Sequence, residues 1–281
     1  MKSLSIVILN LFIINFFVYG QVNNANLNYL IKKSNNPFNY VLNSSFSNYK
    51  ECPKSVDELN TCKNWQKVPG LNDSPDYFHR CSNIFKYSSN ISVGVPKNVF
   101  GFQEPRTGDG YVGISTFERS HYQEYIQTQM IQPLVKNKTY KVGMYVSLAD
   151  KSKYANDRFM FCFTDNARLE KRSRTHQGTI NRYLICPNGV LYLSDTLITD
   201  IINWVHIEVE YTAKGGEEFL TIGVFDGNIN WWERFRKRRN IFNKEYDKWQ
   251  YKVRGAYYYI DDVYVIQRDD YLNTMQNNDD K

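Results

Sequence analysis

Two adjacent acids, Asp261 and Asp262, lie in the middle of the apolar run 257–266. The composition of this run is typical of a β-strand. If Ile260 and Val263 both face a core, the strand cannot alternate with a simple period of two, and one acid is displaced toward the margin of the sheet. A carboxylate in that position needs a cation, a hydrogen-bond donor or a ligand. The acid pair is therefore the first candidate for chemistry in this chain.

A second acidic group lies beside a histidine. His206 and Glu208 share one face of an expected strand with Glu210, at a spacing that could hold a metal ion. We favour the alternative, in which these residues form the solvent face of the strand. The other histidines are His79, His121 and His176. The sequence contains no recognisable nucleophile, zinc or phosphate-binding motif.

Carboxylates that are distant in sequence can still meet in a fold, and glycoside cleavage needs two of them facing each other. The acids that could converge in this way are Glu104, Glu118, Glu124 and Asp150. Because no motif supports this arrangement, a hydrolase ranks third among our hypotheses. We expect the chain not to be an enzyme.

Residues 228–254 form a basic aromatic segment. It contains nine lysines and arginines but only three acids. Its aromatic residues recur at spacings that suit one face of a helix: Trp231, Trp232, Phe235, Phe242, Tyr246 and Trp249. The interpretation that we favour is an insertion whose rings pack on the domain while its charges are solvated. The alternative is a patch that binds an acidic polymer or a membrane surface by charge attraction and stacking.

The elements that must position these residues are β-strands. Alternating apolar patterns recur at 125–131, 139–148, 158–163, 204–211, 218–225 and 256–266. Turn signals rich in glycine, proline and asparagine separate them, and helical periodicity is scarce. The chain is 42% hydrophobic with 22 tyrosines and 17 phenylalanines, which suits sheets around a substantial core. The sequence predicts an all-β chain with one β-sandwich domain over residues 37–267.

The N-terminal residues predict that the chain is exported. Residues 1–20 have the layout of a secretory signal peptide, with one lysine, a short apolar stretch and small residues before Gln21. We expect residues 21–36 to be a flexible leader and residues 268–281 a polar tail. After signal cleavage the chain should have no transmembrane segment. The predicted location is secreted, the outer cell surface or the periplasm, where nucleic acid is a poor partner.

Five cysteines in an exported chain allow at most two disulfides and one leftover thiol. Cys52 and Cys81 flank a turn-rich stretch, and we expect them to form a disulfide. Cys162 could pair with Cys186 or simply be buried. The pairing of Cys62 stays open.

A series of motifs over residues 41–267 resembles a secreted domain of Bacteroidetes that is often found ahead of outer-membrane-protein-A-like peptidoglycan-binding domains. The motifs include 41–46 with Cys52-Pro53, 74–78 with Cys81, 101–105, 145–150 and the Tyr-Ile-Asp-Asp-Val close at 259–263. The resemblance implies a galactose-binding-like jelly roll, the fold of many carbohydrate-binding modules. Relatives have a short polar loop where this chain carries the basic aromatic segment.

The resemblance also implies a structural calcium ion. In carbohydrate-binding jelly rolls an acid of the last strand often joins an acid near the first strand around calcium, and Asp261 matches the former by position. Calcium needs several hard oxygen ligands. Where relatives have Glu after the opening motif, this chain has Ser47. The alternative is that Asp261 and Asp262 accept hydrogen bonds from a neighbouring loop.

The leading functional hypothesis is a secreted, non-catalytic cell-surface module that binds a glycan, with aromatic rings stacking on sugars and polar groups reading hydroxyls. The candidate ligand-binding residues are Tyr77, Gln103, Glu104, Tyr111, Tyr154, Trp231 and Trp232. Most of the first five could equally be core or loop-bracing residues. The alternative is a structural or adhesive envelope protein that binds a protein partner through the basic insertion.

Overall fold

The structure of the chain is a computed structural model that describes residues 38–84, 92–118, 122–167, 169, 171–176, 179–225 and 253–270. The expected signal peptide and leader lie outside these residues. So do residues 228–252 of the expected insertion, including Trp231 and Trp232, and residues 271–281 of the expected tail. In the described part of the chain, no helix has the length and apolar character needed to span a membrane.

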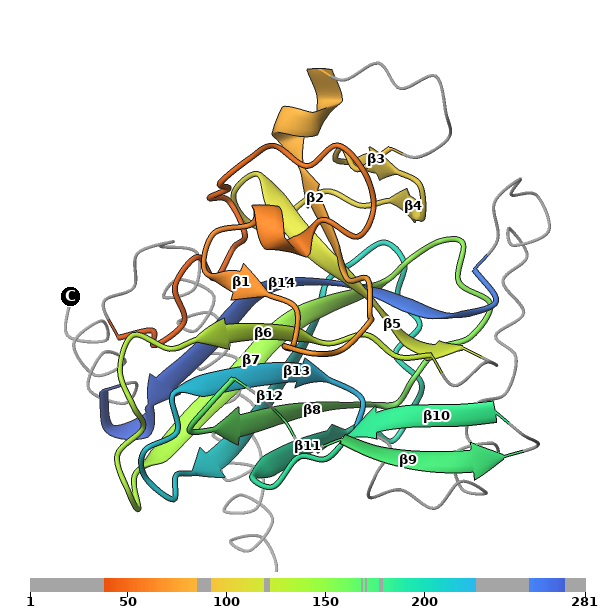
Figure 1. The fold of residues 1–281 in the computed structure, drawn as a ribbon. Coiled ribbons are helices and arrows are strands. Elements are labelled where there is room, and N and C mark those ends of the chain that lie inside the picture. The colour runs from red at the N-terminus through yellow and green to blue at the C-terminus, as the bar shows by residue number, and fades with distance from the viewer. Residues whose placement is uncertain are drawn as a thin grey trace, which may run out of the picture.

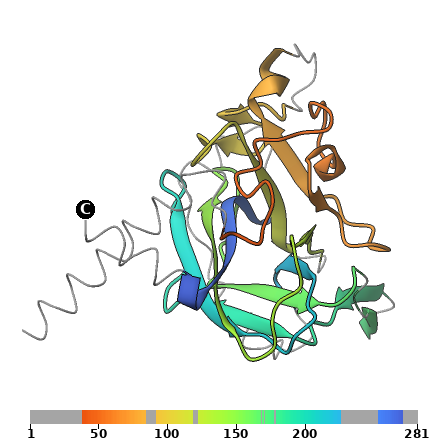
Figure 2. The same ribbon diagram turned by 90° about the vertical axis from the view of Figure 1, so that its left-hand side faces the viewer.

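Eight antiparallel strands form a jelly roll (Figures 1 and 2). One sheet has the order β5 (Gly110–Glu118), β14 (Gly255–Gln267), β7 (Thr139–Leu148) and β12 (Val205–Thr212). The other has the order β6 (Ile126–Gln129), β13 (Phe219–Gly223), β8 (Arg158–Thr164) and β11 (Gly189–Leu193). Apart from the step from β8 to β11, consecutive strands of this set alternate between the sheets, as in a double Greek key. The predicted all-β jelly-roll β-sandwich is confirmed.

Two short strands extend the sheets at one end of the sandwich. β2 (Asp76–His79) pairs with β5, and β1 (Trp65–Gln66) pairs with β6. We call the five-stranded sheet that contains β14 the front sheet and the other the back sheet. The remaining elements are two small hairpins, β3 (Lys97–Asn98) with β4 (Gly101–Phe102) and β9 (Lys171–His176) with β10 (Thr179–Leu184), and the 3-10 helices η1 (Leu59–Thr61) and η2 (Arg80–Ile84).

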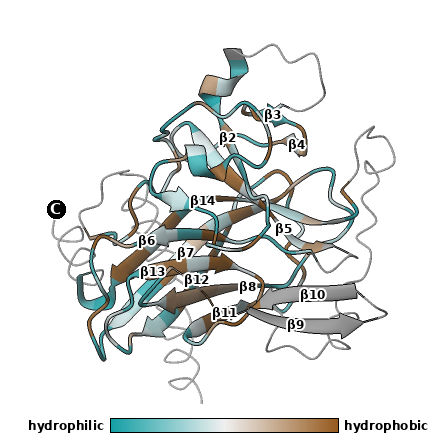
Figure 3. Cartoon of the chain, viewed as in Figure 1, coloured by the Kyte–Doolittle hydropathy of each residue, from teal (hydrophilic) through white to brown (hydrophobic). Residues whose placement is uncertain are grey.

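The main core fills the space between the two sheets. From β14 it takes Tyr258, Ile260, Val263 and Val265, and it takes alternate residues of β7. Figure 3 shows hydrophobic stretches along β8 and β14, and mostly hydrophilic loops between the strands. A second apolar cluster covers part of the outer face of the front sheet, where the ring of Phe100 stacks on Tyr257 with centroids 3.9 Å apart.

The acid pair sits at a β-bulge. The pairing of β14 with β7 shifts register between Asp261 and Tyr264, and Asp262 has a φ of 49°. The bulge buries both Ile260 and Val263, so the predicted break in alternation is confirmed. The prediction that an acid moves to the sheet margin is wrong, because β14 is the middle strand of its sheet.

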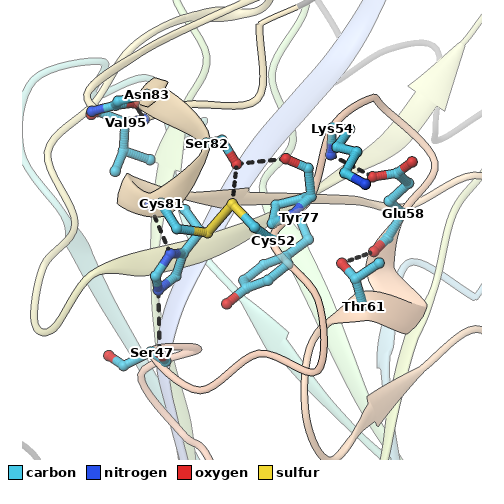
Figure 4. The surroundings of a disulfide bond; sticks show 12 residues. Ser47, Cys52, Lys54, Glu58, Thr61, Tyr77, Cys81, Ser82, Asn83 and Val95 are labelled. Carbon is cyan, nitrogen blue, oxygen red and sulfur yellow. Dashed lines mark hydrogen bonds between the residues drawn. A yellow bond between two sulfur atoms is a disulfide. The ribbon is translucent and has the colours of Figure 1, made fainter. Parts of the chain in front are cut away.

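Two disulfides are present, and in each of them at least one cysteine lies outside the β-strands. Cys52 is bonded to Cys81, as predicted, and Cys162 is bonded to Cys186. Near the first bond, Ser82 donates a hydrogen bond to the carbonyl of Pro53 at 2.6 Å (Figure 4). Cys62 is a free, buried thiol. Burial raises the pKa of this thiol far above its usual value, so the thiol stays protonated and is a poor nucleophile.

Candidate functional site

The outer face of the front sheet carries a patch of aromatic and charged side chains beside the loop 103–109. We call it the polar-aromatic face and define it by Arg106, Lys141, Tyr145, His206, Glu208 and Tyr264. Strand alternation produces it. On β12, Ile207 lies in the core, so its neighbours on either side point outward.

A glycine allows the face to form. Gly143 on β7 is the pairing partner of both Glu208 on β12 and Tyr264 on β14. Tyr264 extends across Gly143 toward β12, and a Cβ at this position would overlap the Tyr264 hydroxyl. The absence of a side chain therefore lets one tyrosine connect three strands.

Hydrogen bonds link the groups on this face into a chain. Lys141 Nζ lies 2.7 Å from Glu208 Oε1, and the Tyr264 hydroxyl donates to Glu208 Oε2 at 2.7 Å. His206 Nε2 lies 2.9 Å from the same hydroxyl oxygen. Burial opposes the charge of Lys141, but its ion pairs with Glu208 and Glu210 outweigh burial and raise the pKa of Lys141.

Three side chains are also stacked. The guanidinium carbon of Arg106 lies 3.4 Å from the centre of the Tyr145 ring, and the Tyr145 and His206 rings are 4.6 Å apart. Burial, together with the nearby charges of Arg106 and Lys141, lowers the pKa of His206 despite the opposing effect of Glu208. His206 is therefore neutral at pH 7.

The acid pair holds the loop that borders this face. Asp261 Oδ2 accepts hydrogen bonds from the backbone N–H groups of Arg106 and Thr107, at 2.8 and 3.3 Å. Asp262 accepts from the guanidinium of Arg106 and from the hydroxyl of Thr107, each at 2.5 Å. Both acids are fully buried. This arrangement matches the alternative predicted from the sequence, in which Asp261 and Asp262 accept hydrogen bonds from a neighbouring loop.

These residues do not fit a calcium ion. The oxygens of Asp261 face N–H donors, and among the described residues no three His, Cys, Asp or Glu side chains group in a way that could hold a metal. Ser47 braces the same loop, since its hydroxyl accepts the N–H of Asp109 at 3.1 Å. The structure supports neither the predicted calcium site nor the interpretation of His206 with Glu208 as metal ligands.

Three of the predicted ligand-binding residues, Gln103, Glu104 and Tyr111, lie together beside the polar-aromatic face. Tyr111 donates to the carbonyl of Gln103 at 3.0 Å, and the indole N–H of Trp204 donates to the carbonyl of Glu104 at 3.0 Å. Gln103 also donates to the carbonyl of Ile202 at 3.4 Å. Glu104 is exposed, whereas Gln103 and Tyr111 are buried, so only Glu104 of these three offers its side chain to a ligand. Gln103 and Tyr111 are loop braces.

The other predicted residues lie elsewhere. Tyr77 is fully buried, and its hydroxyl donates to the carbonyl of Phe46 at 2.6 Å. Tyr154 is buried in the main core, edge-on to Phe117. Neither ring has an open face for stacking on a sugar, because both are enclosed by the domain. Trp231 and Trp232 lie outside the described residues.

The acids considered for glycoside cleavage do not share one open site. Glu124 is buried and accepts hydrogen bonds from the Ser115 N–H and the Tyr122 hydroxyl. Asp150 accepts the N–H of Phe102 at 2.7 Å, while Glu104 pairs with Arg80 at the surface. The side chain of Glu118 is outside the described part. The three described carboxylates act as structural acceptors or surface ions.

Five residues of this region were not predicted from the sequence as site residues: Arg106, Lys141, Tyr145, Trp204 and Tyr264. Their roles depend on cross-strand neighbours, which a single sequence does not reveal. One signal was present in the sequence, because a glycine inside the predicted strand 139–148 often marks a close approach by another group. Gly143 is such a position.

Comparisons with known proteins give structural matches only. No family model matches the chain, and no curated protein does. A proposed sugar-binding protein from Bacteroides thetaiotaomicron matches with 10% identity and a TM-score of 0.38, over 82% of this chain and 100% of that one. The K1 cleaved adhesin domain of Lys-gingipain from Porphyromonas gingivalis matches with 11% identity and a TM-score of 0.33, over 80% of this chain and 96% of that one.

The CBM22-1 xylan-binding domain from Paenibacillus barcinonensis matches with 12% identity and a TM-score of 0.33, over 76% of this chain and 91% of that one. Similarity at this level assigns no function. The resemblance to the Bacteroidetes domain stays an interpretation of the motifs.

Proposed function

We propose that the chain is a secreted, non-catalytic module that binds a cell-surface glycan on the polar-aromatic face. The observation that carries the proposal is the joining of stacked rings and hydrogen-bonding groups on one sheet face, next to the partly exposed Trp204. Trp204 and His206 are the partly exposed rings here and would pack against the apolar face of a sugar, while the buried Tyr145 and Tyr264 support them from below. The polar groups beside them would bind the sugar's hydroxyl groups.

The rigidity of the face also supports binding. Tyr264 is fully buried and Tyr145 nearly so, and each has a fixed partner on a neighbouring strand. The loop 103–109 is fastened to the sheet through Asp261 and Asp262. A preorganised surface loses little side-chain entropy on binding, which matters for a ligand as flexible as a glycan.

The two disulfides are consistent with a secreted or surface protein, because such bonds persist in oxidising compartments. The signal peptide remains a prediction from the sequence. In the alternative function, an envelope protein would bind a protein partner through the basic insertion.

The test is binding of residues 21–281 to soluble neutral polysaccharides (galactomannan, dextran, a β-glucan) and to polygalacturonate, at 0.05 and 0.5 M salt. We expect at least one neutral polymer to bind with an affinity that hardly changes with salt, because uncharged contacts are not screened. Trp204→Ala should weaken this binding about fivefold or more, since an aromatic contact is worth about 1 kcal/mol or more and about 1.4 kcal/mol is tenfold.

The matched control is Leu193→Ala, which removes an exposed apolar side chain from β11 on the back sheet. It should leave binding unchanged. Binding of polygalacturonate alone, lost at high salt and insensitive to Trp204→Ala, would favour the insertion as the binding segment. Absence of binding to every polymer would contradict the proposal.

A further inference from the structure

The charges on the polar-aromatic face are matched within the protein. Arg106 pairs with Asp262, and Lys141 pairs with Glu208 and Glu210. Arg268 approaches Glu210 from the end of β14, at 3.8 Å. An acidic ligand would have to compete with these carboxylates, so the face is better suited to an uncharged ligand that forms hydrogen bonds.

The hydrogen-bond chain fixes where the protons are. Glu208 is paired with Lys141, so it is ionised and can only accept. The Tyr264 hydroxyl has one proton and donates it to Glu208. Its oxygen must therefore accept from His206, which places the proton of a neutral His206 ring on Nε2.

The second ring nitrogen of His206 is then an acceptor. No hydrogen bond joins Nδ1 to any residue that the structure describes, and the side chain is partly exposed. The ring is held by stacking on Tyr145 and by the bond to Tyr264. It thus presents a lone pair in a fixed position on the outer face of the sheet.

We propose that His206 is a specificity-determining residue of the glycan site, whose Nδ1 accepts a hydrogen bond from one hydroxyl group of an uncharged sugar. The inference rests on the proposed function and names its ligand class and one contact. It goes beyond that function because it assigns the direction of the hydrogen bond and makes recognition depend on a neutral imidazole.

Protonation of His206 should remove the contact, because Nδ1 then becomes a donor. The charged and titratable groups around the ring come from three elements and a loop: Glu208 on β12, Lys141 and Tyr145 on β7, Asp262 and Tyr264 on β14, and Arg106 in the loop 103–109. Burial and the two cations favour the neutral ring at pH 7. Binding should therefore be retained at neutral pH and weakened once acid protonates the ring.

The first experiment measures affinity for the neutral polysaccharide that binds best in the panel, at pH 7.5 and at an acidic pH at which nitrogen-15 NMR shows the His206 ring to be protonated. We expect the native chain to bind about three- to tenfold more weakly once the ring is protonated, the range for one lost hydrogen bond. His206→Asn keeps an acceptor near the position of Nδ1 and should retain binding at both pH values. His206→Gln keeps the link to Tyr264 but lacks that acceptor, and should bind weakly at both.

Thermal unfolding of each variant at both pH values checks that it is folded. Binding of the native chain that is independent of pH, or native affinity in His206→Gln, would overturn the inference while leaving glycan binding intact. Absence of binding to all neutral polymers at both pH values would overturn the proposed function and the inference together.

A second experiment needs no ligand. Nitrogen-15 NMR of the histidine rings distinguishes the two neutral tautomers, and we expect His206 to carry its proton on Nε2 at pH 7.5. Replacement of Tyr264 by Phe should change this signal, whereas Tyr49→Phe, at an exposed ring remote in sequence, should not. A proton on Nδ1 in the native chain would overturn the inference whatever the binding data show.

Discussion

At the residue scale, two glycines let two tyrosines of β14 cross neighbouring strands in opposite directions. Tyr264 passes over Gly143 to reach Glu208, and Tyr257 passes over Gly113 to donate a hydrogen bond to Asp76. Each crossing satisfies a carboxylate with a phenol from the central strand. The front sheet therefore holds its outer face together by side-chain bonds as well as by its backbone ladder.

Gly143→Ala should destabilise the fold by about 1–3 kcal/mol. The added methyl group overlaps the Tyr264 side chain, and this side chain cannot move away without disturbing the packed sheet. Urea unfolding measures the change. Tyr264→Ala in the same chain removes the overlap, so the double variant should lose less stability than the two single variants summed. Additive effects would mean that Gly143 is not required by Tyr264.

Arg106→Ala should destabilise the protein by about 3–5 kcal/mol, since it leaves the fully buried Asp262 without its cation. Asp262→Asn retains a short polar side chain that tolerates the positive φ, and it should be less costly. Chemical denaturation of both variants makes the comparison. Equal losses would show that the charge of Asp262 is not what Arg106 compensates.

At the element scale, strand β2 and the segment before β6 bring two buried acids close together. Asp76 and Glu124 are each 3% exposed and repel one another. Desolvation by burial raises the pKa of Asp76 to about 7 and that of Glu124 to about 8, against the hydrogen bonds that favour their charged forms. Burial similarly raises the pKa of Asp73 to about 6.

These acids make stability depend on pH. Their pKa values are higher in the folded than in the unfolded chain, so the folded state binds more protons and loses stability as pH rises. The loss begins near the unfolded pKa values of about 4 and is complete once the pH has passed the folded values of about 7 and 8. Between about pH 6.5 and 8.5 it is not offset by the lowered pKa of His79 and His206, which acts in the opposite direction at lower pH. Urea unfolding at several pH values tests this.

The combined variant Asp76→Asn with Glu124→Gln should flatten the curve over that window, because neither side chain then titrates. Glu104→Gln changes an exposed acid and should leave the curve as it was. A native curve that rises between pH 6.5 and 8.5 would contradict the raised pKa of these two carboxyls in the folded chain.

The elements themselves were largely predictable from the sequence. The pattern 139–148 coincides with β7, and 256–266 differs from β14 by one residue at each end, because alternating apolar residues reflect burial on one sheet face. β5 was missed, since Gly110 and Gly113 suggest a turn when no neighbour is known. The site was less predictable, because Arg106, Tyr145 and His206 are brought together only by strand register and loop path.

At the scale of the whole molecule, the jelly roll places two different surfaces on the two sides of its front sheet. The inner side is the main core, and the outer side passes from the second apolar cluster to the polar-aromatic face. The loop 103–109 separates the two parts and is anchored to the bulge of β14. The bulge thus connects core packing to the polar-aromatic face.

The disulfides should also contribute to the stability of the whole molecule. The bond Cys162–Cys186 closes a loop of 24 residues in sequence separation between β8 and the segment before β11. Cys162→Ala with Cys186→Ala should lower the free energy of unfolding by about 2–4 kcal/mol. Cys62→Ala leaves both bonds in place and serves as the control for loss of a buried sulfur. An equal loss in both would assign the effect to packing.

The central claim is that an uncharged glycan binds on the polar-aromatic face, and chemical-shift mapping of residues 21–281 tests it most directly. The chain is titrated with the neutral polysaccharide that binds best in the panel, at 0.15 and 0.5 M salt. The account predicts shifts centred on Trp204, His206 and Glu208 that are the same at both salt concentrations. Shifts confined to the back sheet or to residues 228–254, or shifts that vanish at the higher salt, would contradict it.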